Sequence, residues 1–187
     1  MKIQRGEFGY IKARKRKALL GTVLMALFGI AVFLTGLFLN KMSNQNIFTV
    51  IAVLFVLPGA KYLVAYIVTF PYRSVERARY EKAEKALPEG MKLYTDLVIT
   101  SPEKVMHLDF AAVGNGYVIC LLGQRKQDLS YVRKYLTEGV HNWGSEYKVK
   151  IIESEKTFLG ELAGVKPCEM DEEEEEHVKS YLTSLIV

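Results

Sequence analysis

Two cysteines and three histidines are the residues of this 187-residue sequence with the widest chemical range, as nucleophiles, acid–base groups or metal ligands. The cysteines are Cys120 and Cys168, and the histidines are His107, His141 and His177. Their spacing does not match that of metal ligands, so we do not expect a zinc site. His107 and Cys120 fall in neighbouring predicted strands and could pair as base and nucleophile, but a cysteine inside an apolar strand is more often a core residue. We therefore interpret Cys120 as core and expect both cysteines to be free thiols in a reducing cytosol.

One basic side chain lies inside a long apolar run. Lys61 is the only charged residue in the 24 residues from Ile47 to Phe70, about 13 Å from the end of the run at the helical rise. A lysine within a membrane is a functional candidate by default. Neither apolar run offers a carboxylate to pair with it, so the competing interpretation is that Lys61 extends its amine towards the headgroups. Pro58 and Gly59, just before it, predict a kink.

The first apolar run, from Ala18 to Leu39, has 22 residues and no charge, which is enough to cross a bilayer as a helix. It is too long for the apolar part of a signal peptide and no cleavage site follows it, so we expect a retained span. With the second run it predicts a transmembrane hairpin over 18–70, made of spans 18–39 and 47–70. Gly29 and Gly36 share one face of the first span, which we assign to contact with the second span, with self-association as the alternative.

Basic residues are concentrated near the ends of the two runs. Residues 1–17 form an arm with seven basic residues and one acid, five basic residues follow the second run, and the loop between the runs has only Lys41. The positive-inside rule therefore predicts a multi-pass protein of the cell membrane with both termini in the cytoplasm. We expect the basic arm to bind anionic lipid of the inner leaflet. Residues 71–187 carry 16 basic and 20 acidic residues, a net charge that argues against general nucleic-acid binding.

Beyond the second run the sequence predicts a small cytoplasmic α/β domain over 71–187 with a mixed four-stranded sheet. Its main elements follow the order helix, three strands, helix, strand, helix. The helices are predicted over 74–87 and 128–141, over a short segment 155–162, and after Asp171, and the strands over 93–100, 105–113, 117–122 and 147–152. Gly114-Asn115-Gly116 predicts a tight turn between strands. The apolar third strand is expected to be central in the sheet.

Two local patterns in this domain predict where side chains point. In the second strand, Met106, Leu108 and Phe110 should share one face, with His107 and Asp109 on the other. The six acids from Asp171 to Glu176 open a helix, with Asp171 as N-cap, and we prefer this interpretation to a cation or partner site.

The order of elements, with an aspartate in the second strand and a hairpin to an apolar third strand, resembles the restriction-endonuclease-like fold over roughly residues 76–152. It looks most like the nuclease-related domain and the type IV restriction-endonuclease relatives, several of which are tethered by paired transmembrane helices. The resemblance implies a strand-borne aspartate that binds a divalent metal, followed by a Glu or Gln and a Lys two residues further on. Oxygen ligands suit Mg²⁺ or Mn²⁺, and the lysine would polarise the attacking water or the phosphate.

In this comparison Asp109 matches the metal-binding aspartate. The expected second position falls on Leu121-Leu122-Gly123, which cannot bind a metal, whereas Gln124 and Lys126 match the Gln-x-Lys variant beyond the predicted strand end. The competing interpretation makes Asp109 an exposed strand acid and places Gln124 and Lys126 in an ordinary solvated loop.

We therefore expect a membrane-anchored cytoplasmic binding or interaction domain without an intact catalytic site. The alternative is a membrane-tethered, metal-dependent nuclease that uses Asp109, Gln124 and Lys126 on nucleic acid. No Walker loop, dinucleotide-binding turn or nucleophile elbow supports another chemistry. The expected partners are the lipid bilayer and, through the membrane helices, a protein partner or a second copy of the chain.

Overall fold

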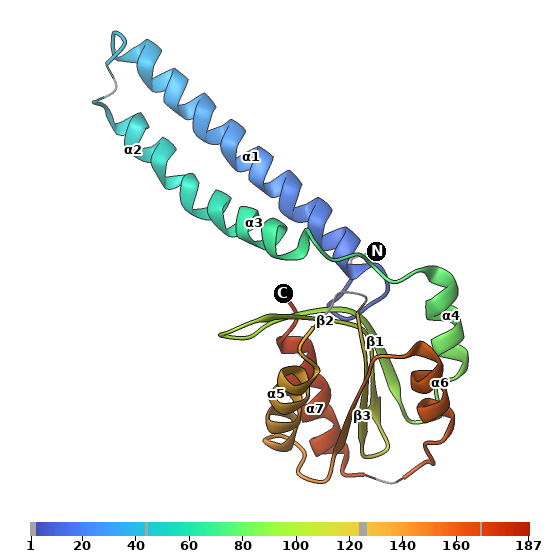
Figure 1. Cartoon of the computed structure of the whole chain (residues 1–187). Coiled ribbons are helices and arrows are strands. Elements are labelled where there is room, and N and C mark those ends of the chain that lie inside the picture. The colour runs from blue at the N-terminus through green and yellow to red at the C-terminus, as the bar shows by residue number, and fades with distance from the viewer. Residues whose placement is uncertain (1–2, 44, 124–126, 169) are drawn as a thin grey trace. The chain divides into compact units, whose positions relative to one another are not determined.

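The computed structural model describes residues 3–43, 45–123, 127–168 and 170–187. The chain forms two units (Figure 1). Residues 12–71 form a pair of long helices, and residues up to Ile11 join residues 72–187 in an α/β unit. The start of the chain thus groups with the α/β unit, whereas the sequence predicts a separate arm over 1–17.

The helix pair consists of α1 (Tyr10–Leu39) followed by α2 (Ile47–Leu54) and α3 (Val56–Thr69). The basic residues 12–17 form early turns of α1, the same helix that carries the first apolar run. The second run is interrupted at Phe55, three residues before Pro58. Proline lacks an amide hydrogen and its ring clashes with the carbonyl four residues earlier, here that of Leu54, so a break at the end of α2 is expected. Both runs are long and apolar enough to cross a membrane.

Glycines of α1 allow its backbone to lie close to α2 and α3. A Cβ added to Gly36 would lie 2.4 Å from Cβ of Phe48, and a Cβ added to Gly21 would lie 2.7 Å from ring atoms of Tyr62. At Gly29 the nearest atoms, of α2 and Phe55, would be 3.5 Å away. Gly29 and Gly36 therefore face the partner helix of the same hairpin, as predicted, because small residues permit close helix packing.

The α/β unit contains a four-stranded mixed sheet in the order β1-β2-β3-β4. β1 pairs antiparallel with β2, β2 antiparallel with β3, and β3 parallel with β4. Helices α4 and α6 cover one face and α5 and α7 the other (Figure 1). The bounds in chain order are α4 (Arg77–Lys85), β1 (Lys92–Thr100), β2 (Val105–Gly114), β3 (Tyr117–Leu122), α5 (Leu129–His141), β4 (Lys148–Ile152), α6 (Glu155–Ala163) and α7 (Glu172–Ser184).

These elements confirm the predicted mixed sheet of four strands, with β3 inside it. Two helices, α6 and α7, follow β4, so the shorter order ending in a single helix is incomplete. Asn115 and Gly116 both have positive φ, as the tight turn between β2 and β3 requires. Asp171 caps α7 by accepting the amide of Glu173. The acidic run thus opens a helix, where negative charge is favoured by the helix dipole.

The predicted direction of the side chains along β2 is wrong for one residue. Met106 and Leu108 lie in the core under α5 and α7, but Phe110 packs in the opposite core, against Phe158 of α6. The reason is a bulge, since the pairing of β2 with β3 shifts between Leu108 and Phe110. An extra residue in one strand breaks the alternation of faces beyond it. The extra residue is Asp109.

Candidate functional site

Asp109 lies in a buried ionic cluster on the α4/α6 side of the sheet. Only 3% of its surface is exposed, so the interpretation as an exposed strand acid is wrong. Its Oδ2 accepts a hydrogen bond from Nη1 of Arg79 on α4 at 2.8 Å. Its Oδ1 lies 3.8 Å from Nδ1 of His107. The alternation of side chains along β2 directs Asp109 to the α4/α6 side of the sheet, opposite to Leu108, and there its carboxylate meets the Arg79 guanidinium.

Arg79 joins two carboxylates from distant parts of the chain. Besides Asp109 it donates through Nε to Glu155, in the first turn of α6. Burial acts to lower the pKa of the Arg79 guanidinium, but the hydrogen bonds and charges of Glu155 and Asp109 outweigh it and raise the pKa. The cation is therefore permanent, and it connects α4, β2 and α6. A buried charge needs such partners to be tolerated.

A second buried aspartate, Asp96, lies in β1 between Thr95 and Leu97, the partners of Phe110 and Leu108 in β2, and was not singled out from the sequence. Its carboxylate accepts the amide of Ile11 at 3.2 Å and the amide of Val75 at 2.9 Å. Its backbone has a φ of +59°, an uncommon value for a residue with a side chain. Burial raises the pKa of Asp96, and the hydrogen bonds from Val75, Ser74 and Ile11 act in the opposite direction. The signal in the sequence was an acid in the middle of an apolar strand.

Asp96 has a structural task that explains its burial. Ile11 is the second residue of α1, where backbone amides have no partner within the helix. Asp96 supplies the missing acceptor from a distant strand, and its negative charge suits the positive end of the helix dipole. Through Val75 the same carboxylate holds the segment that precedes α4.

The other residues predicted under the nuclease alternative, Gln124 and Lys126, lie outside the described residues. Their neighbour Gln127 is described, and its side chain bonds both backbone groups of His107 at 2.7 Å. Among the described residues no group of three or more His, Cys, Asp or Glu side chains is arranged to hold a metal ion.

Lys61 projects from the surface of α3. Its side chain is exposed, and within the described residues its amine forms no hydrogen bond or ion pair. This geometry fits the interpretation that the amine extends along the helix towards a polar region better than it fits a paired functional lysine.

Neither cysteine forms a disulfide, as predicted. Cys120 is fully buried in the core under α5 and α7, and burial raises the pKa of its thiol to about 12. Because the thiolate is the nucleophilic form, Cys120 is unreactive at neutral pH and serves as a core residue.

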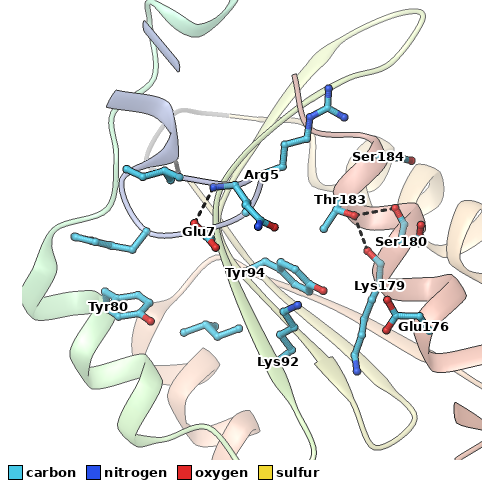
Figure 2. A pocket seen from close by; sticks show the side chains of 15 residues that line it. Arg5, Glu7, Tyr80, Lys92, Tyr94, Glu176, Lys179, Ser180, Thr183 and Ser184 are labelled. Atoms are coloured by element: carbon cyan, nitrogen blue, oxygen red, sulfur yellow. Dashed lines mark hydrogen bonds between the residues drawn. The ribbon is translucent and has the colours of Figure 1, made fainter. Parts of the chain in front are cut away.

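A polar cleft of about 870 Å³ lies over the edge of β1 (Figure 2). Residues 3–8 form one wall, α7 forms another, Tyr80 of α4 closes one end, and Lys92, Leu93 and Tyr94 of β1 form the floor. Phe8 packs against the Tyr80 ring with centroids 4.9 Å apart. The volume is within the usual range for ligand sites. The sequence pattern does not indicate this cleft, because its walls and floor come from segments that are far apart in the chain.

The cleft offers charged groups and hydroxyls rather than an apolar lining. Arg5, Lys92 and Lys179 contribute cations, Glu7 and Glu176 contribute carboxylates, and Ser180, Thr183 and Ser184 contribute hydroxyls. Burial first, then the charges of Glu176 and Glu175, raises the pKa of Tyr94 on the floor to about 12. The phenol therefore stays neutral and can donate a hydrogen bond at physiological pH.

No protein-family model, curated protein or solved structure matches the chain. The resemblance to the restriction-endonuclease-like fold therefore stays a prediction.

Proposed function

We propose that this chain is a membrane-anchored binding protein, in which the helix pair spans the cell membrane and the α/β unit binds a ligand or partner in the cytoplasm without catalysing a reaction. The binding site in this proposal is the cleft over β1, which brings charged, hydroxyl and aromatic side chains together in a space of ligand size.

The surface of the helix pair supports the membrane part of the proposal. Among the described residues, all the large apolar side chains that are exposed belong to the helix pair and its connecting loop, except Ile3, Val105 and Trp143. A continuous apolar surface of this kind is unfavourable in water but suits lipid. The basic residues at both ends of the pair favour cytoplasmic termini. Exposed cations at the start of α1, including Lys12, Arg16 and Lys17, fit anionic lipid.

One observation carries the non-catalytic part of the proposal. The carboxylate of Asp109, the residue best placed to bind a metal under the nuclease alternative, is held by Arg79 at 2.8 Å inside a buried cluster. A metal ion at Asp109 would have to displace this guanidinium or share the carboxylate with it, and two neighbouring cations repel each other. The cluster thus has the character of a structural bridge between α4, β2 and α6.

The alternative function, a membrane-tethered nuclease dependent on Mg²⁺ or Mn²⁺, requires Asp109 to release Arg79. It also requires Asp109 and Gln124 to bring oxygens within about 4–5 Å of each other, as joint ligation at metal–oxygen distances near 2.3 Å demands.

The full-length chain in detergent, incubated with DNA and RNA in Mg²⁺ or Mn²⁺, tests the non-catalytic part. We expect no cleavage above background. Cleavage that disappears in an Asp109→Ala variant would establish the nuclease alternative. Extraction of cell membranes tests the anchor, because an integral protein stays in the pellet after washes with salt and alkaline carbonate, whereas release by salt alone would contradict it.

A further inference from the structure

We propose that the cleft over β1 binds an extended acidic segment of a partner protein, which adds a strand to the open part of the β1 edge. This inference rests on the proposed function, since it names the class of ligand for the same cleft. Strand addition is a common mode of peptide recognition, in which main-chain hydrogen bonds give affinity and flanking side chains give specificity.

Within the described residues, other parts of the chain form backbone hydrogen bonds with the outer edge of β1 at Thr95 and Val98, beyond Leu93 on the floor of the cleft. The amide of Thr95 donates outward to the carbonyl of Gly6 at 2.8 Å, and the carbonyl of Val98 accepts the amide of Val187 at 3.1 Å. Asp96, with its φ of +59°, interrupts the alternation of inward- and outward-directed backbone groups between Thr95 and Val98. From Lys92 to Thr95 the ladder is regular, so the outward amide of Thr95 means that the backbone groups of Leu93 also point outward. Leu93 lies on the floor of the cleft, so an extended ligand there meets a main-chain donor and acceptor.

The cations of the cleft favour a negatively charged segment. In the described part of the chain, neither Arg5 nor Lys92 has a carboxylate partner, and the Lys92 amine lies over the Tyr94 ring at 5.2 Å. In Figure 2 the two cationic side chains extend to opposite sides of Tyr94. Carboxylates on an extended segment that passes Leu93 can meet both, whereas a small anion would meet one of them.

The carboxylates and the third cation of the cleft are less available. Glu7 accepts the amide of Gln4 at 2.7 Å, which stabilises the turn of the N-terminal wall. Lys179 is paired with Glu175 one turn away on α7. Glu176 is exposed on the α7 wall and opposes an acidic ligand on that side. Neutralising Glu176 should therefore strengthen binding of an acidic ligand, which provides a second test of the ligand's charge.

The test measures fluorescence anisotropy of short labelled peptides added to the full-length chain in detergent micelles. The probes are Thr-Glu-Val-Glu-Thr, its lysine counterpart Thr-Lys-Val-Lys-Thr, and the acidic peptide with alternate backbone amides N-methylated. We expect the acidic peptide to bind, and the lysine and N-methylated peptides to bind at least about tenfold more weakly. The lysine peptide lacks the negative charges, and the N-methylated peptide lacks the main-chain hydrogen-bond donors.

Variants give the inference its matched control. Lys92→Glu should weaken binding of the acidic peptide about tenfold, and Glu176→Gln should strengthen it severalfold. Lys148→Glu makes the same charge change on β4, the other edge strand, where the amine also lies over a tyrosine ring, and should leave binding unchanged. Circular dichroism checks that each variant is folded. Absence of binding, equal binding of the N-methylated or lysine peptide, or equal effects of Lys92→Glu and Lys148→Glu would overturn the inference. None of these outcomes bears on the membrane-extraction or nuclease tests.

Discussion

The two units of this chain differ in which side chains they bury and which they expose. In the helix pair the contacts are made by small residues, such as Gly21 and Gly36, while large side chains such as Phe38 point outward with 77% of their surface exposed. In the α/β unit the large side chains, such as Phe110 and Leu136, are fully buried. Buried carboxylates inside that unit have hydrogen-bond partners, such as Arg79 for Asp109 and two backbone amides for Asp96.

This contrast indicates the solvent of each unit. Water drives large apolar side chains inward, whereas lipid does not, so contacts between helices in lipid depend mainly on close backbone packing. The contrast therefore supports a bilayer around the helix pair and water around the α/β unit. Substitutions whose expected effects differ in size between the two units test it.

The largest contrast should come from removing a phenylalanine in each unit. Phe110→Ala should lower the free energy of unfolding of the α/β unit by about 3–5 kcal/mol, because it leaves a cavity against Phe158. Phe38→Ala should change the free energy of unfolding of the helix pair by no more than about 0.5 kcal/mol. Urea titration of the full chain in detergent, followed by fluorescence of Trp143, the single tryptophan, measures the first effect. Unfolding by added SDS, followed by far-UV circular dichroism, measures the second. Similar losses for the two variants would contradict the comparison.

The buried ionic cluster should give the next largest effect. Arg79→Met leaves the Asp109 carboxylate buried without its cation and should cost about 3 kcal/mol in the same titration. Combining it with Asp109→Leu removes the unpaired charge, so the double variant should regain most of the loss. If the double variant is no more stable than the single one, the cluster is not held together by this pair.

Helix packing in the hairpin should respond to a single methyl group. Gly36→Ala places a Cβ against Phe48 and should destabilise the helix pair by about 1–3 kcal/mol. Gly59→Ala is the matched control, because its Cβ would lie 3.4 Å from Met25, an ordinary contact. The midpoint of unfolding by added SDS, followed by far-UV circular dichroism, should fall for Gly36→Ala and not for Gly59→Ala. Equal shifts would mean that the two helices do not pack at Gly36.

The smallest effect should be the pH dependence contributed by Asp96. Burial raises its pKa in the folded state, so the folded state holds the proton more tightly than the unfolded state. This contribution is therefore most favourable below the unfolded pKa, about 4, and is lost as pH rises through the raised folded value. Relative to Asp96→Asn, the wild type should lose stability as pH rises from about 4. A wild type that gains stability relative to Asp96→Asn as pH rises would show that the folded pKa is lowered instead.

Much of the fold could be predicted because it depends on local patterns. Asp128 caps α5 by accepting the amide of Tyr131. The turn at Asn115 and Gly116 joins β2 to β3 and determines the register in which these two strands pair next to it. Periodicity and turn chemistry of this kind are visible in short stretches of sequence. The long charge-free runs likewise identify both apolar helices without knowledge of their neighbours.

The candidate site could not be predicted in the same way. The bulge after Leu108 depends on the pairing of two strands. Asp109 is buried because α4 and α6 cover its face of the sheet with Arg79 and Glu155, and this cover is not visible in the sequence of the strand itself. The cleft requires residues 3–8, β1 and α7 to meet, and these segments are far apart in the sequence. Contacts over such distances leave no periodic signal in the sequence.

The two bonds to the Asp96 carboxylate make the hairpin an exchangeable insert. The amides of Ile11 and Val75 donate to the same side chain, so the chain leaves the α/β unit and returns to it at neighbouring positions. A short loop could therefore join these two positions in place of residues 12–71. The sheet would not need to change, and an apolar hairpin of another length could be substituted to suit a thicker or thinner bilayer.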